Sequence, residues 1–302
     1  MLLSEVIQYK NLPLIAQKAM EGFITGLHNS PFHGFSVEFS EHRAYNPGES
    51  IRNLDWKLLA KTEKNYIKQF NEETNLKCHL WLDVSKSMQY PAPNLDKLKF
   101  EILAASSIAY ICANQRDAFS FSLFSEAQIS WKSEMKSTLS HFRNCLSQLS
   151  PYWENEIPAV SDSSIGISEL AATVKRRNLV VIFSDLLWDK TQQNEEAQFW
   201  ETISILQFQK CEVLLVHVAH EETEINLNLG TIPMKFIDLE SNEVLKLQPE
   251  EIQELYSKSQ NEQRKELENK SLQLGISYFY ANVTKPIQEV LMEFYVKRSK
   301  IL

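Results

Sequence analysis

The segment Leu80-Trp81-Leu82-Asp83-Val84-Ser85-Lys86-Ser87-Met88 joins an apolar, strand-like run to one carboxylate and two hydroxyls at alternate positions. Hard divalent cations such as Mg²⁺ take oxygen ligands and usually keep several waters. The segment therefore predicts a weak, oxygen-only metal site at the end of a strand, with Asp83, Ser85 and Ser87 among its ligands.

Apolar strand-like runs alternate with helical patterns from about residue 76 onward. This alternation indicates a mainly parallel sheet covered by helices on both faces, a doubly wound α/β fold. The predicted strands are residues 76–83, 118–125, 178–185, 211–219 and 275–281, with 127–131 as a short antiparallel edge.

Two segments between these strands have strong helical signals. Residues 96–113 carry Leu98, Ile102, Ala105 and Ala109 on one face, which predicts an amphipathic helix. Residues 249–274 start with a proline and two glutamates and end before Gly275, so we expect a long outer helix with a solvated charged face.

Residues 1–75 have a different composition pattern. A helix is predicted from Ser4 to about Gly22, followed by a polar and aromatic stretch with strong turn chemistry at Asn46-Pro47-Gly48-Glu49. We therefore expect a smaller N-terminal α+β subdomain over residues 1–75 and the doubly wound domain over residues 76–302.

Charge and cysteine usage exclude several classes of protein. The net charge of −8 gives no uniform positive field for nucleic acid. No stretch reaches the roughly 18 apolar residues expected of a membrane span, and charged residues near the N-terminus disfavour a signal peptide. Because the four cysteines occur singly, a reduced, cytoplasmic protein is expected.

A second carboxylate is predicted at the same edge of the sheet as Asp83. The apolar run Leu179-Val180-Val181-Ile182-Phe183 is typical of a strand buried on both faces, and it ends in Ser184-Asp185. Ligands of open parallel sheets collect beyond the carboxyl ends of the strands. A hydroxyl of Ser163 or Ser164, from the loop before a helix-like segment, could reach the same edge, and the sequence does not distinguish the two.

These residues resemble the metal-ion-dependent adhesion site of von Willebrand factor A domains. That site combines an Asp-x-Ser-x-Ser loop, a distant Thr or Ser and an Asp after a buried strand. The resemblance implies that Ser85, Ser87 and Ser163 or Ser164 contact Mg²⁺ or Mn²⁺ directly, that Asp83 and Asp185 act directly or through water, and that a partner's carboxylate completes the coordination. This chain departs from the pattern by a serine in the third loop and by Leu186, where many such domains have glycine.

The segment before this site resembles a bacterial family, domain of unknown function number fifty-eight. The matching residues run from Gly34 to Phe39 and from Arg43 to Lys57, and continue through Ser184-Asp185 and Phe236 to Glu240. The resemblance implies association with MoxR-type AAA+ ATPases, for which relatives are thought to act as adaptors or co-chaperones.

The residues are also compatible with other functions. Ser85 and Ser87 could cap a turn while Asp83 and Asp185 accept bonds from backbone N–H groups, giving a metal-free structural interaction domain. A phosphoester hydrolase with Asp83 as nucleophile is disfavoured because Ser85 occupies the place of the expected second acid. The expected function is therefore a metal-dependent protein-binding module rather than an enzyme.

Overall fold

A computed structural model describes residues 12, 15, 39–44, 58–59, 66–70, 76–92, 94, 96–125, 128–156, 166–188, 195–237, 244–290 and 292–293. The chain divides into two compact units, residues 32–76 and residues 1–31 with 77–302. The division into residues 1–75 and 76–302 stays a prediction, because the first 31 residues are described only at Leu12 and Ile15.

The smaller unit contains an antiparallel strand pair. Strand β1 (Phe39–Ala44) pairs with β2 (Tyr66–Phe70), with Phe39 opposite Phe70. In the other unit, Leu12 and Ile15 are helical and buried, but the rest of the helix predicted from Ser4 lies outside the described residues. The same holds for the turn predicted at residues 46–49.

The larger unit is built on a six-stranded sheet. Its order is β10-β7-β6-β3-β4-β5, and every neighbouring pair is parallel except β4 with β5. The strands are β3 (Lys77–Asp83), β4 (Ala118–Ser125), β5 (Gln128–Lys132), β6 (Leu179–Ser184), β7 (Glu212–Ala219) and β10 (Ser277–Asn282). The prediction of a mainly parallel sheet with one antiparallel edge is confirmed.

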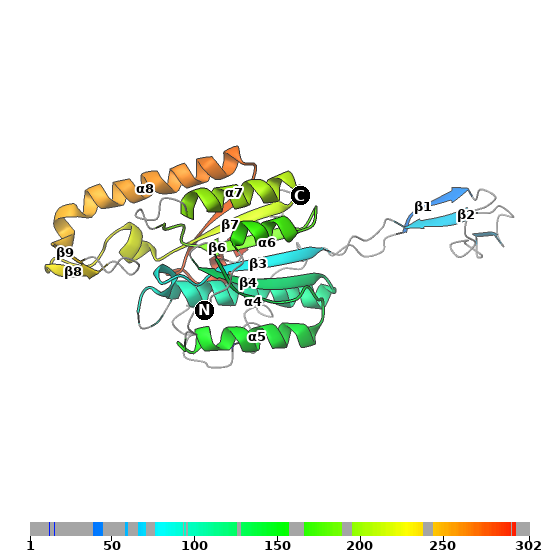
Figure 1. Cartoon of the computed structure of the whole chain (residues 1–302), viewed down its shortest axis with the longest axis horizontal. Coiled ribbons are helices and arrows are strands. Elements are labelled where there is room, and N and C mark those ends of the chain that lie inside the picture. Colours follow the sequence, from blue (N-terminus) through cyan, green and yellow to red (C-terminus); the bar gives the residue numbers. More distant parts are fainter. Residues whose placement is uncertain are drawn as a thin grey trace. The chain divides into compact units, whose positions relative to one another are not determined.

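Helices cover both faces of this sheet (Figure 1). They are α4 (Asp96–Gln115) and α5 (Leu139–Trp153) on one face, and α6 (Ile167–Thr173), α7 (Glu195–Phe208) and α8 (Pro249–Gln273) on the other. Val180 and Ile182 of β6 pack in one core with side chains of α6 and α7, whereas Phe183 lines a small apolar cavity with residues of α4. Strand β6 is thus buried on both faces, and the doubly wound α/β fold is confirmed.

Helix α4 differs from its prediction. The sequence predicts an amphipathic helix, but α4 is buried on nearly all sides and buries Lys97 and Glu101 together with its apolar residues. The reason is its position, because α4 contacts β3, β4, β7, α5 and the 3₁₀ turn η2 (Ser87–Gln89). Charged groups of α4 therefore lie inside the molecule.

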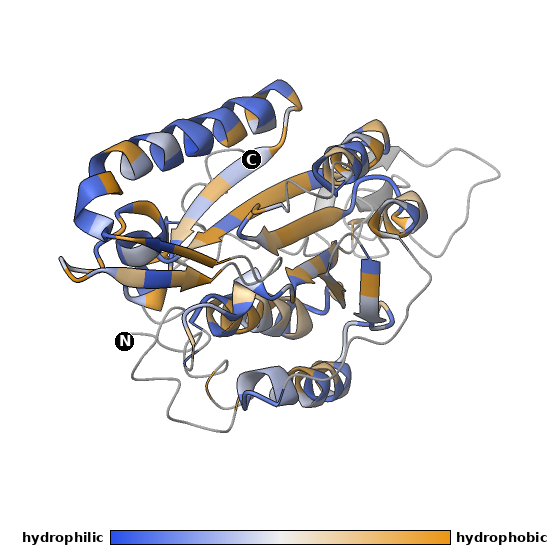
Figure 2. Cartoon of the chain, turned by 60° about the vertical axis from the view of Figure 1, so that its left-hand side comes forward, coloured by the Kyte–Doolittle hydropathy of each residue, from blue (hydrophilic) through white to orange (hydrophobic). Residues whose placement is uncertain are grey.

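The remaining elements lie on the surface of the larger unit. Helix α8 is largely hydrophilic, in contrast to the strands of the sheet (Figure 2). The hairpin of β8 (Met234–Ile237) and β9 (Val244–Leu247), which the sequence did not predict, follows the π-helical turn η3 (Glu221–Ile225). In the described part of the chain, no helix has the length and apolar character of a membrane span.

The two-faced burial of β6 predicts a large penalty for shortening its side chains. Ile182 is fully buried, so Ile182→Ala should lower the free energy of unfolding by about 2 to 5 kcal/mol. The matched control is Leu255→Ala, at a side chain that is 74% exposed, which should change it by less than about 0.5 kcal/mol. Urea denaturation measures both, and equal effects would contradict the described core.

Candidate functional site

The site lies where the chain changes direction across the sheet. Strand β3 pairs with β4 on one side and with β6 on the other, and the connection through α4 leads to β4. Such a switch point leaves a crevice beyond the carboxyl ends of two neighbouring strands, here β3 and β6. Asp83 ends β3 and Asp185 directly follows β6, so both predicted carboxylates lie at this point.

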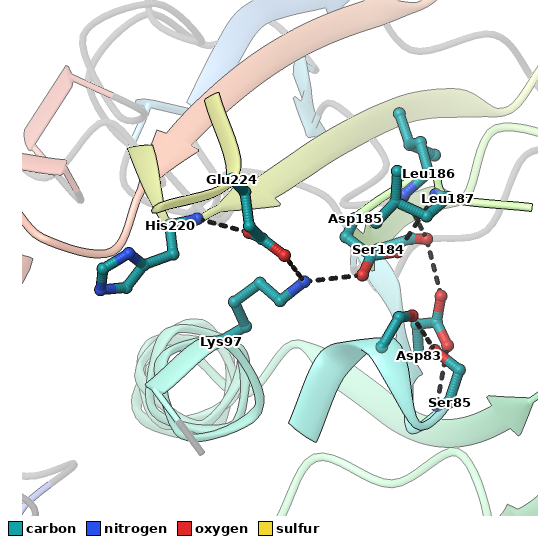
Figure 3. Close-up of polar contacts among 10 residues, drawn as sticks. Asp83, Ser85, Lys97, Ser184, Asp185, Leu186, Leu187, His220 and Glu224 are labelled. Atoms are coloured by element: carbon teal, nitrogen blue, oxygen red, sulfur yellow. Dashed lines mark hydrogen bonds and ion pairs between the residues drawn. The ribbon is translucent and has the colours of Figure 1, made fainter. Parts of the chain in front are cut away.

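The Asp83 carboxylate is held by the two strand ends together (Figure 3). Its Oδ1 accepts a hydrogen bond from the Ser85 backbone N–H at 3.0 Å, and its Oδ2 accepts one from the Ser184 hydroxyl at 2.7 Å. The hydroxyls of Ser85 and Ser87 lie 3.0 Å apart. The structure thus brings Asp83, Ser85, Ser87 and Asp185 into one cluster, and each carboxylate oxygen still has a second lone pair.

Asp185 is paired with a cation from α4. Lys97 Nζ lies 2.8 Å from Asp185 Oδ2 and 2.5 Å from Glu224 Oε1 of η3, while Asp185 Oδ1 accepts the Leu187 backbone N–H at 3.1 Å (Figure 3). Lys97 is fully buried. Burial alone would lower the pKa of Lys97, but Asp185 and Glu224 outweigh it and raise that pKa above its ordinary value, so the amine stays charged.

A third carboxylate lies beside this pair. Glu101 is fully buried on α4, and among the described residues neither of its carboxylate oxygens has a hydrogen-bond partner of good geometry. Burial, followed by the charges of Asp83 and Asp185, raises the pKa of Glu101 well above its ordinary value. Burial, then Asp185, also raises the pKa of Asp83 to about 7.

The buried groups carry an excess of negative charge. Asp83, Glu101 and Asp185 are accompanied by Lys97 as the one fully buried cation of the site among the described residues, which leaves a formal charge of −2 on these four buried groups when all are ionised. Two protons or one divalent cation would neutralise this charge. Neutralisation is favourable because an uncompensated buried charge is costly. The carboxylate and hydroxyl oxygens suit Mg²⁺ or Mn²⁺. In the described ranges no three His, Cys, Asp or Glu side chains converge as ligands, so hydroxyls and water would have to supply the remaining positions.

One departure from the adhesion-site pattern, Leu186 in place of glycine, has a structural explanation. Its φ of 55° lies in the left-handed region that favours glycine, so a leucine here costs about 1 to 2 kcal/mol. The side chain is 1% exposed and packs in the apolar core with Val180 and Ile182. Burial of a leucine contributes about 1.5 to 3 kcal/mol, which offsets the strain and holds the loop that carries Asp185.

Two predicted site residues cannot be placed, and four residues of the cluster were not predicted. Ser163 and Ser164 lie outside the described residues, so their place stays a prediction. Sequence reasoning missed four residues of the cluster: Lys97, Glu101, Ser184 and Glu224. The spacing of four places Lys97 and Glu101 on one side of a helix, but this pattern is equally typical of a solvated helix surface and does not mark a site. Glu224 has no sequence signal, since its contact with Lys97 joins positions 127 residues apart.

The fold and this cluster define a doubly wound α/β protein with a carboxylate-rich site at its switch point. The model of the family described as "Protein of unknown function DUF58" matches residues 41–266, and the chain belongs to this family. The family predicted from the sequence is therefore confirmed. Its likeness to von Willebrand factor A domains and its association with MoxR-type ATPases stay predictions.

Relatives from two mycobacteria are similar to part of the chain. Uncharacterized proteins of Mycobacterium bovis and Mycobacterium tuberculosis are each 22% identical to it over 178 residues, which is 59% of this chain. The match spans 56% of each relative, so the chain aligns with little more than half of their length.

The raised pKa of Asp83 predicts a pH-dependent stability. In the unfolded chain Asp83 ionises near pH 4, but in the folded chain it holds its proton up to about pH 7, so the free energy of unfolding falls as pH rises between these values. Relative to Asp83→Asn, the wild-type protein should lose up to roughly 3 kcal/mol between pH 5 and pH 8 in EDTA.

The comparison with Asp83→Asn reports the Asp83 carboxyl group together with its effect on Glu101, whose pKa the charge of Asp83 helps to raise. His79 and His217 act in the opposite direction, because burial lowers the pKa of each to about 4, and they are unchanged in the variant. Urea denaturation at several pH values gives the two profiles. Parallel profiles for wild type and Asp83→Asn would show that the Asp83 pKa is not raised.

Proposed function

We propose that this protein is a metal-dependent protein-binding module and not an enzyme. In this proposal Asp83, Ser85, Ser87 and Asp185 would hold Mg²⁺ or Mn²⁺ at the carboxyl edge of the sheet. The observations that carry the proposal are the excess of buried negative charge and the Glu101 carboxylate, whose two oxygens have no hydrogen-bond partner of good geometry among the described residues. A buried carboxylate without a partner points to a cation or a proton that the site takes up.

The ligand set suits recognition of an acidic side chain. Two carboxylates and two hydroxyls leave positions for water on an octahedral cation, and a partner's carboxylate can replace one water. Turn η3 adds Glu221, Glu222 and Glu224 near this edge, so without a divalent cation an acidic partner would be repelled. We therefore expect the partner to bind only when the cation is present.

We propose a MoxR-type AAA+ ATPase as the partner, with this protein as its adaptor or co-chaperone. The support for this partner is the family resemblance in the sequence, together with a ligand set that would leave a coordination position for a partner's carboxylate. Ser163 or Ser164 is proposed as an additional ligand on the same resemblance.

A phosphoester hydrolase with Asp83 as nucleophile is less well supported. The pKa of Asp83 is raised to about 7, so this carboxyl is about half protonated at neutral pH. A protonated carboxyl is a poor nucleophile. A metal-free structural domain is the other alternative, and it predicts no heat on titration with Mg²⁺ or Mn²⁺.

Capture of a MoxR-type ATPase tests the proposal. In buffer with constant Mg²⁺, the wild-type protein should retain the ATPase, and Asp83→Ala should reduce retention at least about ten-fold because the cation loses a ligand. The variant is the decisive arm, since a chelator would also remove the Mg²⁺ that the ATPase needs for its nucleotide.

The matched control is Glu266→Ala on the exposed part of α8, which should leave retention unchanged. Circular dichroism establishes that both variants are folded. Equal retention by wild type, Asp83→Ala and Glu266→Ala would remove the metal site from the binding mechanism.

A further inference from the structure

Lys97 occupies an unusual place for a lysine. Its side chain is fully buried, and its ammonium group lies between Asp185, which belongs to the candidate metal site, and Glu224, which does not. Among the described residues it is the only lysine or arginine that forms an ion pair with a carboxylate of that site. The site therefore already contains a cation that is part of the chain.

This arrangement sets Lys97 against a divalent cation. Lys97 takes Asp185 Oδ2, and the Leu187 backbone N–H takes Oδ1, so both oxygens of this carboxylate have a donor. An ammonium group and a divalent ion on one carboxylate repel each other, and in a buried site this repulsion is screened much less than in water. A divalent ion that binds Asp185 would therefore weaken the ion pair of this carboxylate with Lys97.

Glu224 is a second carboxylate with which Lys97 can form an ion pair. The ammonium group is already 2.5 Å from Glu224 Oε1, and the other oxygen of Glu224 accepts the His220 backbone N–H at 2.8 Å, which holds the carboxylate in place. Lys97 can therefore lose Asp185 and remain paired. Because Glu224 belongs to η3, the charge would move from the site to this turn.

We propose that Lys97 is the resident cation of the site, which competes with the divalent ion for Asp185 and shifts its pairing to Glu224 when that ion binds. This inference rests on the proposed function and names the group that sets its metal affinity. It gives two variants opposite effects. Removing the ammonium group should tighten metal binding, and removing the charge of Glu224 should weaken it, since Lys97 then pairs with Asp185 alone.

Calorimetric titration with Mn²⁺ alone tests this inference. Lys97→Met should bind Mn²⁺ at least about ten-fold more tightly than wild type, and Glu224→Gln about three-fold or more weakly. The matched control is Lys270→Met, which removes another lysine that pairs with a glutamate, Glu196 at 3.0 Å, away from the site. It should bind Mn²⁺ as wild type does. Lys97→Gln provides the same test if Lys97→Met does not fold.

The outcomes separate this inference from the proposed function. Binding by wild type with equal or weaker binding by both Lys97 variants would overturn the role of Lys97 and leave the metal site standing. Absence of binding in every protein would overturn the metal site itself, and the inference with it. Binding by a Lys97 variant without measurable binding by wild type would support the competition in its strongest form.

Discussion

The buried ion pair of Lys97 with Asp185 is the interaction on which the rest of the site depends. It joins the first turn of α4 to the loop after β6, and through Glu224 it reaches η3 after β7. Without this ammonium group, no lysine or arginine in the described part of the chain would pair with the carboxylates at the switch point. Breaking such a buried pair from one side costs about 3 to 5 kcal/mol.

The doubly wound topology explains why these charges meet at all. Parallel strands bring their carboxyl ends to one edge, and the chain leaves β3 for α4 on one face of the sheet and β6 for α7 on the other face (Figure 1), which leaves room there for polar groups. Helices pack on both faces of the sheet, and Asp83 and Asp185 are buried at that edge, so their charges are poorly solvated. A scaffold that is stable because of its apolar strands therefore creates a site with strong electrostatics.

The sequence predicts the strands well because strands that are buried on both faces are continuous apolar runs. Residues 118–125 were predicted as a strand and form β4 with the same bounds. The hairpin of β8 and β9 was missed because its strands are four residues long, carry one lysine each and lack an extended apolar run.

The site could be predicted in part. Asp83, Ser85, Ser87 and Asp185 follow strands, and the position of a strand end can be inferred from local pattern. Lys97 and Glu101 could not be assigned, because a charged residue on a helix is usually solvated and only tertiary packing around α4 buries it. The burial of Lys97 and Glu101 adds one positive and one negative charge to the site that the loop motif alone does not reveal.

In the proposed site, the carboxyl edge of the sheet binds a divalent cation between Asp83 and Asp185. Anomalous diffraction from crystals soaked in Mn²⁺ tests it most directly. We predict an anomalous peak within about 2 to 2.5 Å of an oxygen of Asp83, Ser85, Ser87 or Asp185, or within water-bridged distance of the two carboxylates. A peak only elsewhere on the molecule, or none in a crystal with an open path to this edge, would contradict a cation site between Asp83 and Asp185.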